Sequence, residues 1–181
     1  MIADNWKKDI ANIARKLEGR FRQKTWNVRS GYAVEKSLAL GLLAVRKLIE
    51  AKEVSHQVLG NNPVVYEFKL PQNRKSLLGK LPIERLYDFR NGKKTSLSIE
   101  TVCHQFIHSV IFRPYVPTRK VMLGVFVSSD KQRTKSLFYI PLEQIIGLMR
   151  SVAKDSPVSP TMIVNKKTGK RSVSFRTKNA I

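Results

Sequence analysis

The sequence is poor in acidic residues and in cysteine. Its 181 residues include 13 Asp and Glu against 34 Lys and Arg, and a single cysteine, Cys103. One cysteine excludes an internal disulfide, which is typical of a protein in a reducing compartment. The shortage of carboxylates leaves a net charge of +21 at pH 7.

Long apolar runs are also missing. The longest run, residues 38–45, reads LALGLLAV, whereas a helix that spans a bilayer needs about 20 apolar residues. The first residues of the chain are polar and charged, without the apolar stretch of a secretory signal peptide. We therefore expect a cytoplasmic protein with no membrane partner.

Positive charge is the most prominent feature that the sequence does have. A net charge of +21 repels itself unless a polyanion lies nearby, so nucleic acid is the expected partner. The alternative is an acidic protein partner, which would make the chain a basic subunit of a larger complex. No RNP, zinc-finger or clear helix-turn-helix signature is present, so the sequence does not separate RNA from DNA.

The basic residues gather in two stretches, and we expect both to contact mainly phosphates. Trp26 lies within the first stretch, where its ring can stack on a base. The same ring is equally suited to fill the core at a corner between two helices. The candidate nucleic-acid-binding residues are Arg20, Arg22, Lys24, Trp26, Arg29, Lys166, Lys167, Lys170, Arg171 and Arg176.

Hydrophobic periodicity predicts two helices in the first third of the chain. Residues 4–23 place apolar side chains at three- and four-residue steps, as an amphipathic helix does. Residues 30–52 predict a second helix. Its middle, residues 38–45, is apolar almost all round, which indicates a buried central helix. Within it, Gly41 would let neighbouring helices approach closely.

Strand patterns follow the two helices. Residues 64–70 alternate in the two-residue period of a half-buried strand. Residues 121–127 and 136–140 predict an antiparallel hairpin, and Pro141 opens a helix over residues 142–154. A short helix is favoured over residues 82–89, with a tight turn at Asn91-Gly92 as the alternative.

Together these elements predict an α+β fold. It has an N-terminal helical portion with a buried central helix, followed by antiparallel hairpins and a C-terminal helix. Two prolines within residues 113–120 argue against regular structure there. Residues 1–155 are expected to form a single domain, and residues 156–181 a basic hairpin or a flexible arm.

Residues 96–112 predict a further helix around which the fold is organised. Phe106 lies on its apolar face, and Gln105 lies on another face. His104 and His108 are one helical turn apart and lie on the same side of the helix, away from its apolar face.

The two histidines raise the question of metal chemistry. Histidines at i and i+4 can share a metal ion, but HQFIH has Gln105 where a zinc protease has its glutamate. The nucleophile motif G-x-S-x-G and the full spacing of a phosphate-binding P-loop are absent as well. We therefore expect no metal and no cofactor.

Metal-free cleavage of RNA is the alternative to simple binding. It needs a base, an acid and a cation that holds the phosphate. His108 and His104 can supply the base and the acid. The cation would be Arg113, one helical turn after His108, or Arg85 and Arg90. In the simpler alternative, these arginines only position phosphates.

Two helical segments carry a resemblance to a known family. The helix end RKLIEAK, residues 46–52, and the segment CHQFIHS, residues 103–109, resemble HEPN-type helical ribonucleases over about residues 1–112. The resemblance implies a helical bundle that cleaves RNA with an Arg closely followed by a His on one helix. The sequence departs from that pattern, because no His follows Arg46 closely.

Overall fold

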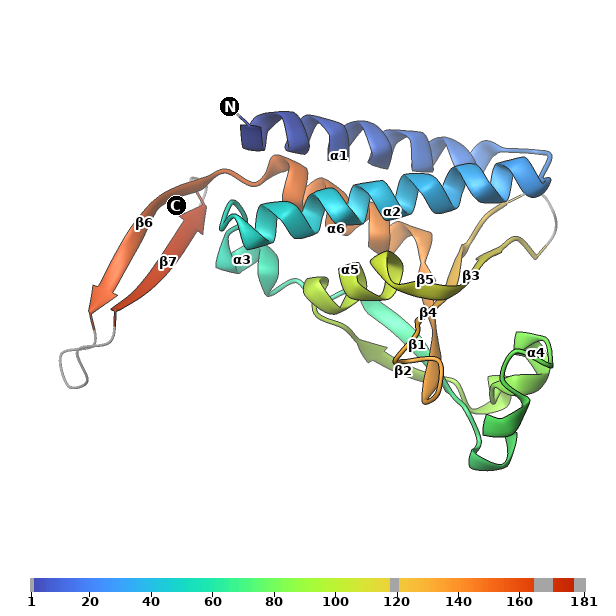
Figure 1. Cartoon of the computed structure of the whole chain (residues 1–181). Helices are drawn as coiled ribbons and strands as arrows, with labels where there is room; N and C mark the ends of the chain where they lie inside the picture. Colours follow the sequence, from blue (N-terminus) through green and yellow to red (C-terminus); the bar gives the residue numbers. More distant parts are fainter. Residues whose placement is uncertain (1, 118–120, 165–170, 178–181) are drawn as a thin grey trace.

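Figure 1 shows the computed structural model, which describes residues 2–117, 121–164 and 171–177. The helices are α1 (Ile2–Gly19), α2 (Val28–Glu50), α3 (His56–Leu59), α4 (Ile83–Leu86), α5 (Ile99–Ile107) and α6 (Leu142–Lys154). The strands are β1 (Val64–Lys69), β2 (Lys93–Ser96), β3 (Ser109–Tyr115), β4 (Gly124–Ser129), β5 (Ser136–Pro141), β6 (Pro157–Val164) and β7 (Arg171–Thr177). The predicted α+β class is confirmed.

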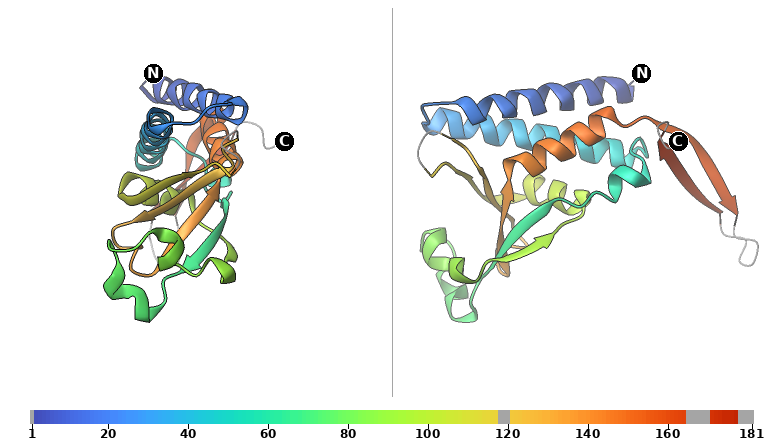
Figure 2. Two further views of the ribbon diagram at one scale, coloured as in Figure 1. Left: turned by 90° about the vertical axis from the view of Figure 1, so that its right-hand side faces the viewer. Right: turned by 180° about the vertical axis from the view of Figure 1, so that it is seen from behind.

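Five strands form one antiparallel sheet in the order β2-β1-β5-β4-β3. The strand predicted at residues 64–70 is β1, and the predicted hairpin is β4–β5. Helices α1, α2, α5 and α6 lie together on one side of this sheet (Figures 1 and 2). We call the face beneath them the helix face, and the opposite face the open face.

The main core lies between the helices and the helix face of the sheet. Leu38 and Leu42 of α2 and Ile145 of α6 are fully buried in it, together with Val65 and Val125 of the sheet. Close packing is possible because α2 has a glycine at position 41. A Cβ there would stand 2.6 Å from Met149 Cε and 3.1 Å from Ile13 Cγ2. The expected close approach at Gly41 is thus confirmed.

The central helix α2 is buried along one face but not all round. Leu40 is 51% exposed and Leu43 is 37% exposed, on the side next to α1. Helices α1, α5 and α6 all pack against α2. Residues 38–45 therefore supply apolar side chains to the main core and, through Leu40 and Leu43, an exposed apolar strip next to α1.

The predicted helix at residues 96–112 ends earlier than its periodicity indicates. Helix α5 begins after Ser98, whose hydroxyl accepts from the backbone N–H of Thr101, and it ends at Ile107. The chain then extends into β3, which pairs with β4 and contains Pro114. β-branched and aromatic residues fit a strand as well as a helix, so pairing with β4 decides the outcome.

Other details of the structure also differ from the local patterns. Gln105 is only 3% exposed, and residues 113–115 are strand, with Pro114 on an edge strand where proline is tolerated. β1 and β2 pair across the long excursion of residues 70–92, so the alternative tight turn at Asn91-Gly92 is not formed. The favoured short helix of this region is α4.

Residues 70–92 cover part of the open face. Ile83 and Leu86 of α4 pack with Leu137 of β5 in a second, smaller core. The hydroxyl of Tyr87 donates to the backbone carbonyl of Arg133 at 2.8 Å, which ties the excursion to the turn between β4 and β5.

The C-terminal strands β6 and β7 pair with each other in a separate two-stranded sheet (Figure 1). This arrangement is the hairpin that was expected as one of two alternatives for residues 156–181. Whether the boundary at residue 155 separates two domains stays a prediction.

Candidate nucleic-acid interface

The turn between α1 and α2 presents the first predicted basic cluster. Arg22, Lys24 and Arg29 are exposed, whereas Arg20 is half-buried and donates to the side chain of Gln23. We call these four cations the basic turn. It lies at the end of the molecule where β3 ends and β4 begins (Figures 1 and 2).

Hydrogen bonds hold the basic turn in one conformation. Asn27 caps α2 by accepting from the backbone N–H of Ser30 at 2.9 Å. Gln23 Nε2 donates to the carbonyl of Thr25 at 2.6 Å and to Ser30 Oγ at 2.8 Å. The cations therefore project from an ordered backbone, which lowers the entropy cost of binding an anion.

Trp26 takes the second of its two expected roles. Its ring is half-buried and packs against the main core. The indole Nε1 is buried and has no hydrogen-bond partner among the described residues. The ring therefore fills the corner between α1 and α2 and does not stand out as a stacking platform.

The second predicted basic cluster belongs to the C-terminal strands. Arg171 and Arg176 lie on β7, paired with Val164 and Val158 of β6. Lys166, Lys167 and Lys170 lie outside the described residues.

His104 and His108 are brought together as the sequence predicts. His104 is half-buried on α5, and His108 is exposed at the C-cap of that helix. Their ring centroids are 4.8 Å apart. The two imidazoles can therefore contact the same small group, such as one phosphodiester.

The arginines expected beside the histidines lie elsewhere. Because the chain extends after His108, Arg113 lies about 17 Å further along β3, not one helical turn away. Arg113 instead pairs with Glu84 Oε1 at 2.7 Å. Arg85 and Arg90 belong to the excursion that packs on the open face, away from α5. The predicted grouping of these arginines with the histidines is wrong.

Two other cations act on His104 instead. Burial lowers the pKa of His104, and the neighbouring charges of His108, Arg46 and Lys131 lower it further. Arg46 comes from α2 and Lys131 from the turn between β4 and β5. Sequence reasoning set Arg46 aside because no His follows it on its own helix. The charge of Arg46 instead acts on His104 of a different helix, α5.

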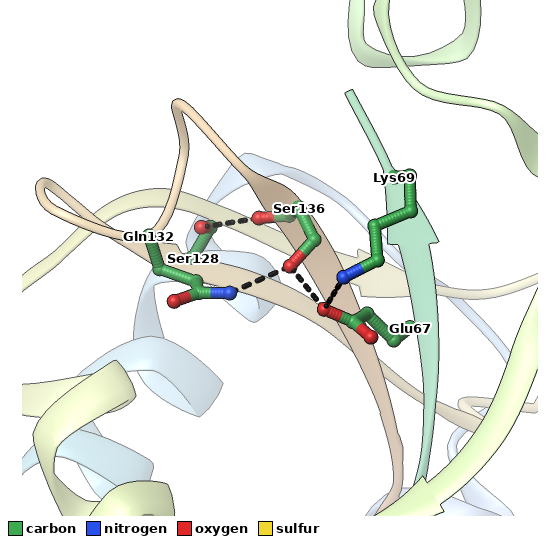
Figure 3. A network of polar contacts seen from close by, with 5 residues as sticks. All are labelled: Glu67, Lys69, Ser128, Gln132 and Ser136. Atoms are coloured by element: carbon green, nitrogen blue, oxygen red, sulfur yellow. Dashed lines mark hydrogen bonds and ion pairs between the residues drawn. The ribbon is translucent and has the colours of Figure 1, made fainter. Parts of the chain in front are cut away.

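Figure 3 shows the polar network that holds the β4–β5 turn. Ser136 Oγ donates to Glu67 Oε1 at 2.7 Å and accepts from Gln132 Nε2 at 2.6 Å. Ser128 Oγ donates to the carbonyl of Ser136, and Lys69 Nζ pairs with Glu67 at 2.8 Å. Burial alone would raise the pKa of Glu67, but the hydrogen bonds from Lys69 and Ser136 outweigh it and lower that pKa.

The same turn is tied to α5. The backbone N–H of Ser129 donates to Gln105 Oε1 at 2.8 Å, and that of Asp130 donates to the carbonyl of His108 at 3.3 Å. These bonds position Lys131 near the histidines.

Metal ligation receives no support from the geometry. Within the described part of the chain, no group of three or more His, Cys, Asp and Glu side chains could hold a metal ion. Cys103 is fully buried, and burial raises the pKa of its thiol to about 12. The thiol therefore stays protonated and packs as an apolar group.

A row of five directly paired residues crosses the open face. Lys94 of β2 pairs with Tyr66 of β1, which pairs with Tyr139 of β5. Tyr139 pairs with Phe126 of β4, and Phe126 pairs with Arg113 of β3. Directly paired residues project to the same face of a sheet. This cross-sheet row therefore places three aromatic rings side by side between two cations.

The rings of the row line a hollow of about 560 Å³ on the open face. Tyr66 and Tyr139 have ring centroids 6.1 Å apart, and Tyr139 and Phe126 are 5.1 Å apart. Tyr115 joins them edge-on, 5.6 Å from Tyr139. Burial raises the pKa of Tyr139 to about 12, so its hydroxyl stays neutral at physiological pH. Tyr66 and Tyr115 are 37% and 38% exposed.

Sequence reasoning missed this hollow. The alternation of Tyr66 and Phe68 in β1 was a visible sign that aromatic rings share one face. Tyr115 and Arg113 could not be added, because their segment was expected to be irregular.

Comparisons with known proteins returned no match, whether to a protein-family model, to a curated protein or to a solved structure. The resemblance to HEPN-type ribonucleases therefore stays a prediction. Among the described residues, no helix has both the length and the apolar character needed to cross a membrane.

Proposed function

We propose that this protein binds nucleic acid, RNA or DNA, mainly through contacts to phosphates. The observation that carries the proposal is the charge. Even if every one of the 13 carboxylates paired with a different cation, 21 of the 34 Lys and Arg side chains would lack an acidic partner. A phosphate backbone supplies the missing negative charge. A cytoplasmic location is part of this proposal.

The basic turn supports the same function. Its exposed cations, Arg22, Lys24 and Arg29, project from a hydrogen-bonded backbone beside the end of β3. Such a cluster can contact successive phosphates without reading the bases.

Fluorescence anisotropy with RNA and DNA oligomers at rising salt tests the proposal. Each phosphate contact releases counterions, so log affinity should fall linearly with log salt concentration. The double variant Arg22→Gln/Lys24→Gln should reduce the slope by about 1 for each phosphate that it no longer neutralises. The matched control is Lys80→Gln. Lys80 is exposed on the excursion, at the other end of the molecule, so its replacement should leave the slope unchanged.

Two outcomes would overturn the proposal. One is the absence of measurable binding at about 50 mM salt, where phosphate contacts are strong. The other is equally tight and salt-sensitive binding of polyglutamate, which would favour an acidic protein partner.

Metal-free cleavage of RNA is a second candidate function. The rings of His104 and His108 are 4.8 Å apart, and the charges of Arg46 and Lys131 act on His104. His104, whose pKa is lowered, takes the proton of a 2′-hydroxyl as its oxygen attacks the adjacent phosphorus. The bond from phosphorus to the 5′ oxygen breaks, and His108 gives a proton to that oxygen. The products are a 2′,3′-cyclic phosphate and a 5′-hydroxyl end.

Incubation of single-stranded RNA with the protein in EDTA tests this candidate. His108→Ala should lower the cleavage rate about 10²- to 10⁴-fold and leave affinity nearly unchanged, since one imidazole adds little to many phosphate contacts. Absence of cleavage by the unmodified protein from acid to neutral pH would leave binding as the sole function.

A further inference from the structure

We infer that the cross-sheet row is a stacking surface for unpaired nucleobases, so that the protein prefers single-stranded RNA or DNA to a duplex. This inference rests on the proposed nucleic-acid binding.

The first support is the order of side chains along the row. Tyr66, Tyr139 and Phe126 follow one another on adjacent strands, with Lys94 at one end and Arg113 at the other. Adjacent strands are spaced so that five of them span about 19 Å. The row therefore offers aromatic faces in its middle and a cation for a phosphate at each end.

The second support is that the side chains of Tyr66 and Tyr115 are partly exposed, at 37% and 38%. Ile83 and Phe89 pack over the Phe68 side of the open face. Both residues also line the hollow, together with Tyr66, Tyr115 and Tyr139. An unpaired base can enter this hollow and lie on a ring, whereas the bases of a duplex are stacked on one another and cannot.

The third support is the charge around the hollow. Lys94 is exposed, and the ion pair between Arg113 and Glu84 has both side chains more than half exposed, at 53% and 59%. Such surface pairs contribute little, so a phosphate can displace Glu84. Glu84 and Glu143 are the acids that act on this region, and the cations at both ends of the row face the solvent.

The test compares Tyr66→Leu with its matched control Tyr66→Phe in the full chain. Anisotropy is measured with a short single-stranded DNA, the same sequence as a duplex, and the same strand with abasic sites in place of its bases. Tyr66→Leu should weaken binding of the single strand about 5- to 100-fold, the effect of losing one base–aromatic stack. Tyr66→Phe keeps the ring and should bind within about twofold of the unmodified protein.

Two further readouts separate stacking from charge. Tyr66→Leu should leave binding of the duplex and of the abasic strand unchanged, and should not alter the salt slope. Lys94→Gln should reduce that slope by about 1 with the intact single strand. Thermal melting of each variant verifies that it is folded.

The outcomes distinguish this inference from the function on which it rests. If Tyr66→Leu and Tyr115→Leu both bind the single strand like the unmodified protein, or if duplex and single strand bind equally, stacking on the row is overturned. Salt-sensitive binding would still stand in that case. If the unmodified protein binds none of the three probes, the proposed function itself fails.

Discussion

The amide oxygen of Gln105 accepts a hydrogen bond from the backbone N–H of Ser129 at 2.8 Å, linking α5 to the end of β4. Both residues are buried, at 3% and 1% exposure. Gln105→Ala should destabilise the protein by about 1–3 kcal/mol, because it leaves a buried N–H without an acceptor. Urea unfolding measures the change. Gln72→Ala, at an exposed glutamine, should change the free energy of unfolding by no more than about 0.5 kcal/mol. Equal losses of stability in the two variants would contradict a stabilising hydrogen bond between Gln105 and Ser129.

Phe106 should be among the most sensitive positions of the main core. It is 3% exposed and meets Phe112 edge-on at 6.2 Å. Phe106→Ala should cost about 3–5 kcal/mol, through lost transfer energy and the cavity left behind. Val110→Ala, at a site 51% exposed on β3, is the control and should change stability by about 0.5 kcal/mol or less. Similar melting temperatures for the two variants would contradict this packing.

Gly124 is required for the position of Tyr139. A Cβ at residue 124 would stand 2.6 Å from the carbonyl oxygen of Ile140 and 2.6 Å from Tyr139 Cε2. Gly124→Ala should therefore destabilise the sheet by about 1–3 kcal/mol. Gly147→Ala, on α6 with nothing near its added Cβ, should instead stabilise the protein by about 0.5–1 kcal/mol. Gly124→Ala should lower the melting temperature and Gly147→Ala should raise it. Shifts of the same sign would contradict the close approach of Gly124 to Tyr139 and Ile140.

Tyr87 should make the fold sensitive to alkaline pH. Burial raises the pKa of its hydroxyl to about 12, against about 10 in the unfolded chain. The folded state keeps the proton longer, so this contribution is complete below pH 10 and is lost as pH rises from 10 to 12. At pH 11 the loss should be about 1 kcal/mol relative to pH 8.

Comparison with Tyr87→Phe isolates that contribution from other groups that titrate in the same range. The variant lacks the hydroxyl that donates to Arg133, so it should be less stable by about 1 kcal/mol at pH 8. The difference between the two proteins should shrink by pH 11. Parallel stability curves would show that folding does not raise the pKa of Tyr87.

The sequence by itself determined the elements whose patterns are local. Helices α1, α2 and α6, strand β1 and the β4–β5 hairpin follow from periodicity and from Pro141 at the start of α6. The pairing of His104 with His108 was predictable for the same reason, since both lie within one turn of one helix. Charge and composition, which need no structure, are the basis of the proposed nucleic-acid partner.

Tertiary structure alone decided the features that depend on contacts between distant segments. Residues 109–115 suit a helix or a strand, and pairing with β4 made them β3, which moved Arg113 away from His108. Contact between α2 and α5 brought the charge of Arg46 to His104. The order β2-β1-β5-β4-β3 aligned Tyr66, Tyr139 and Phe126 in one row. Strand order and register arise from burial of side chains that are far apart in the chain, so no local pattern in the sequence contains them.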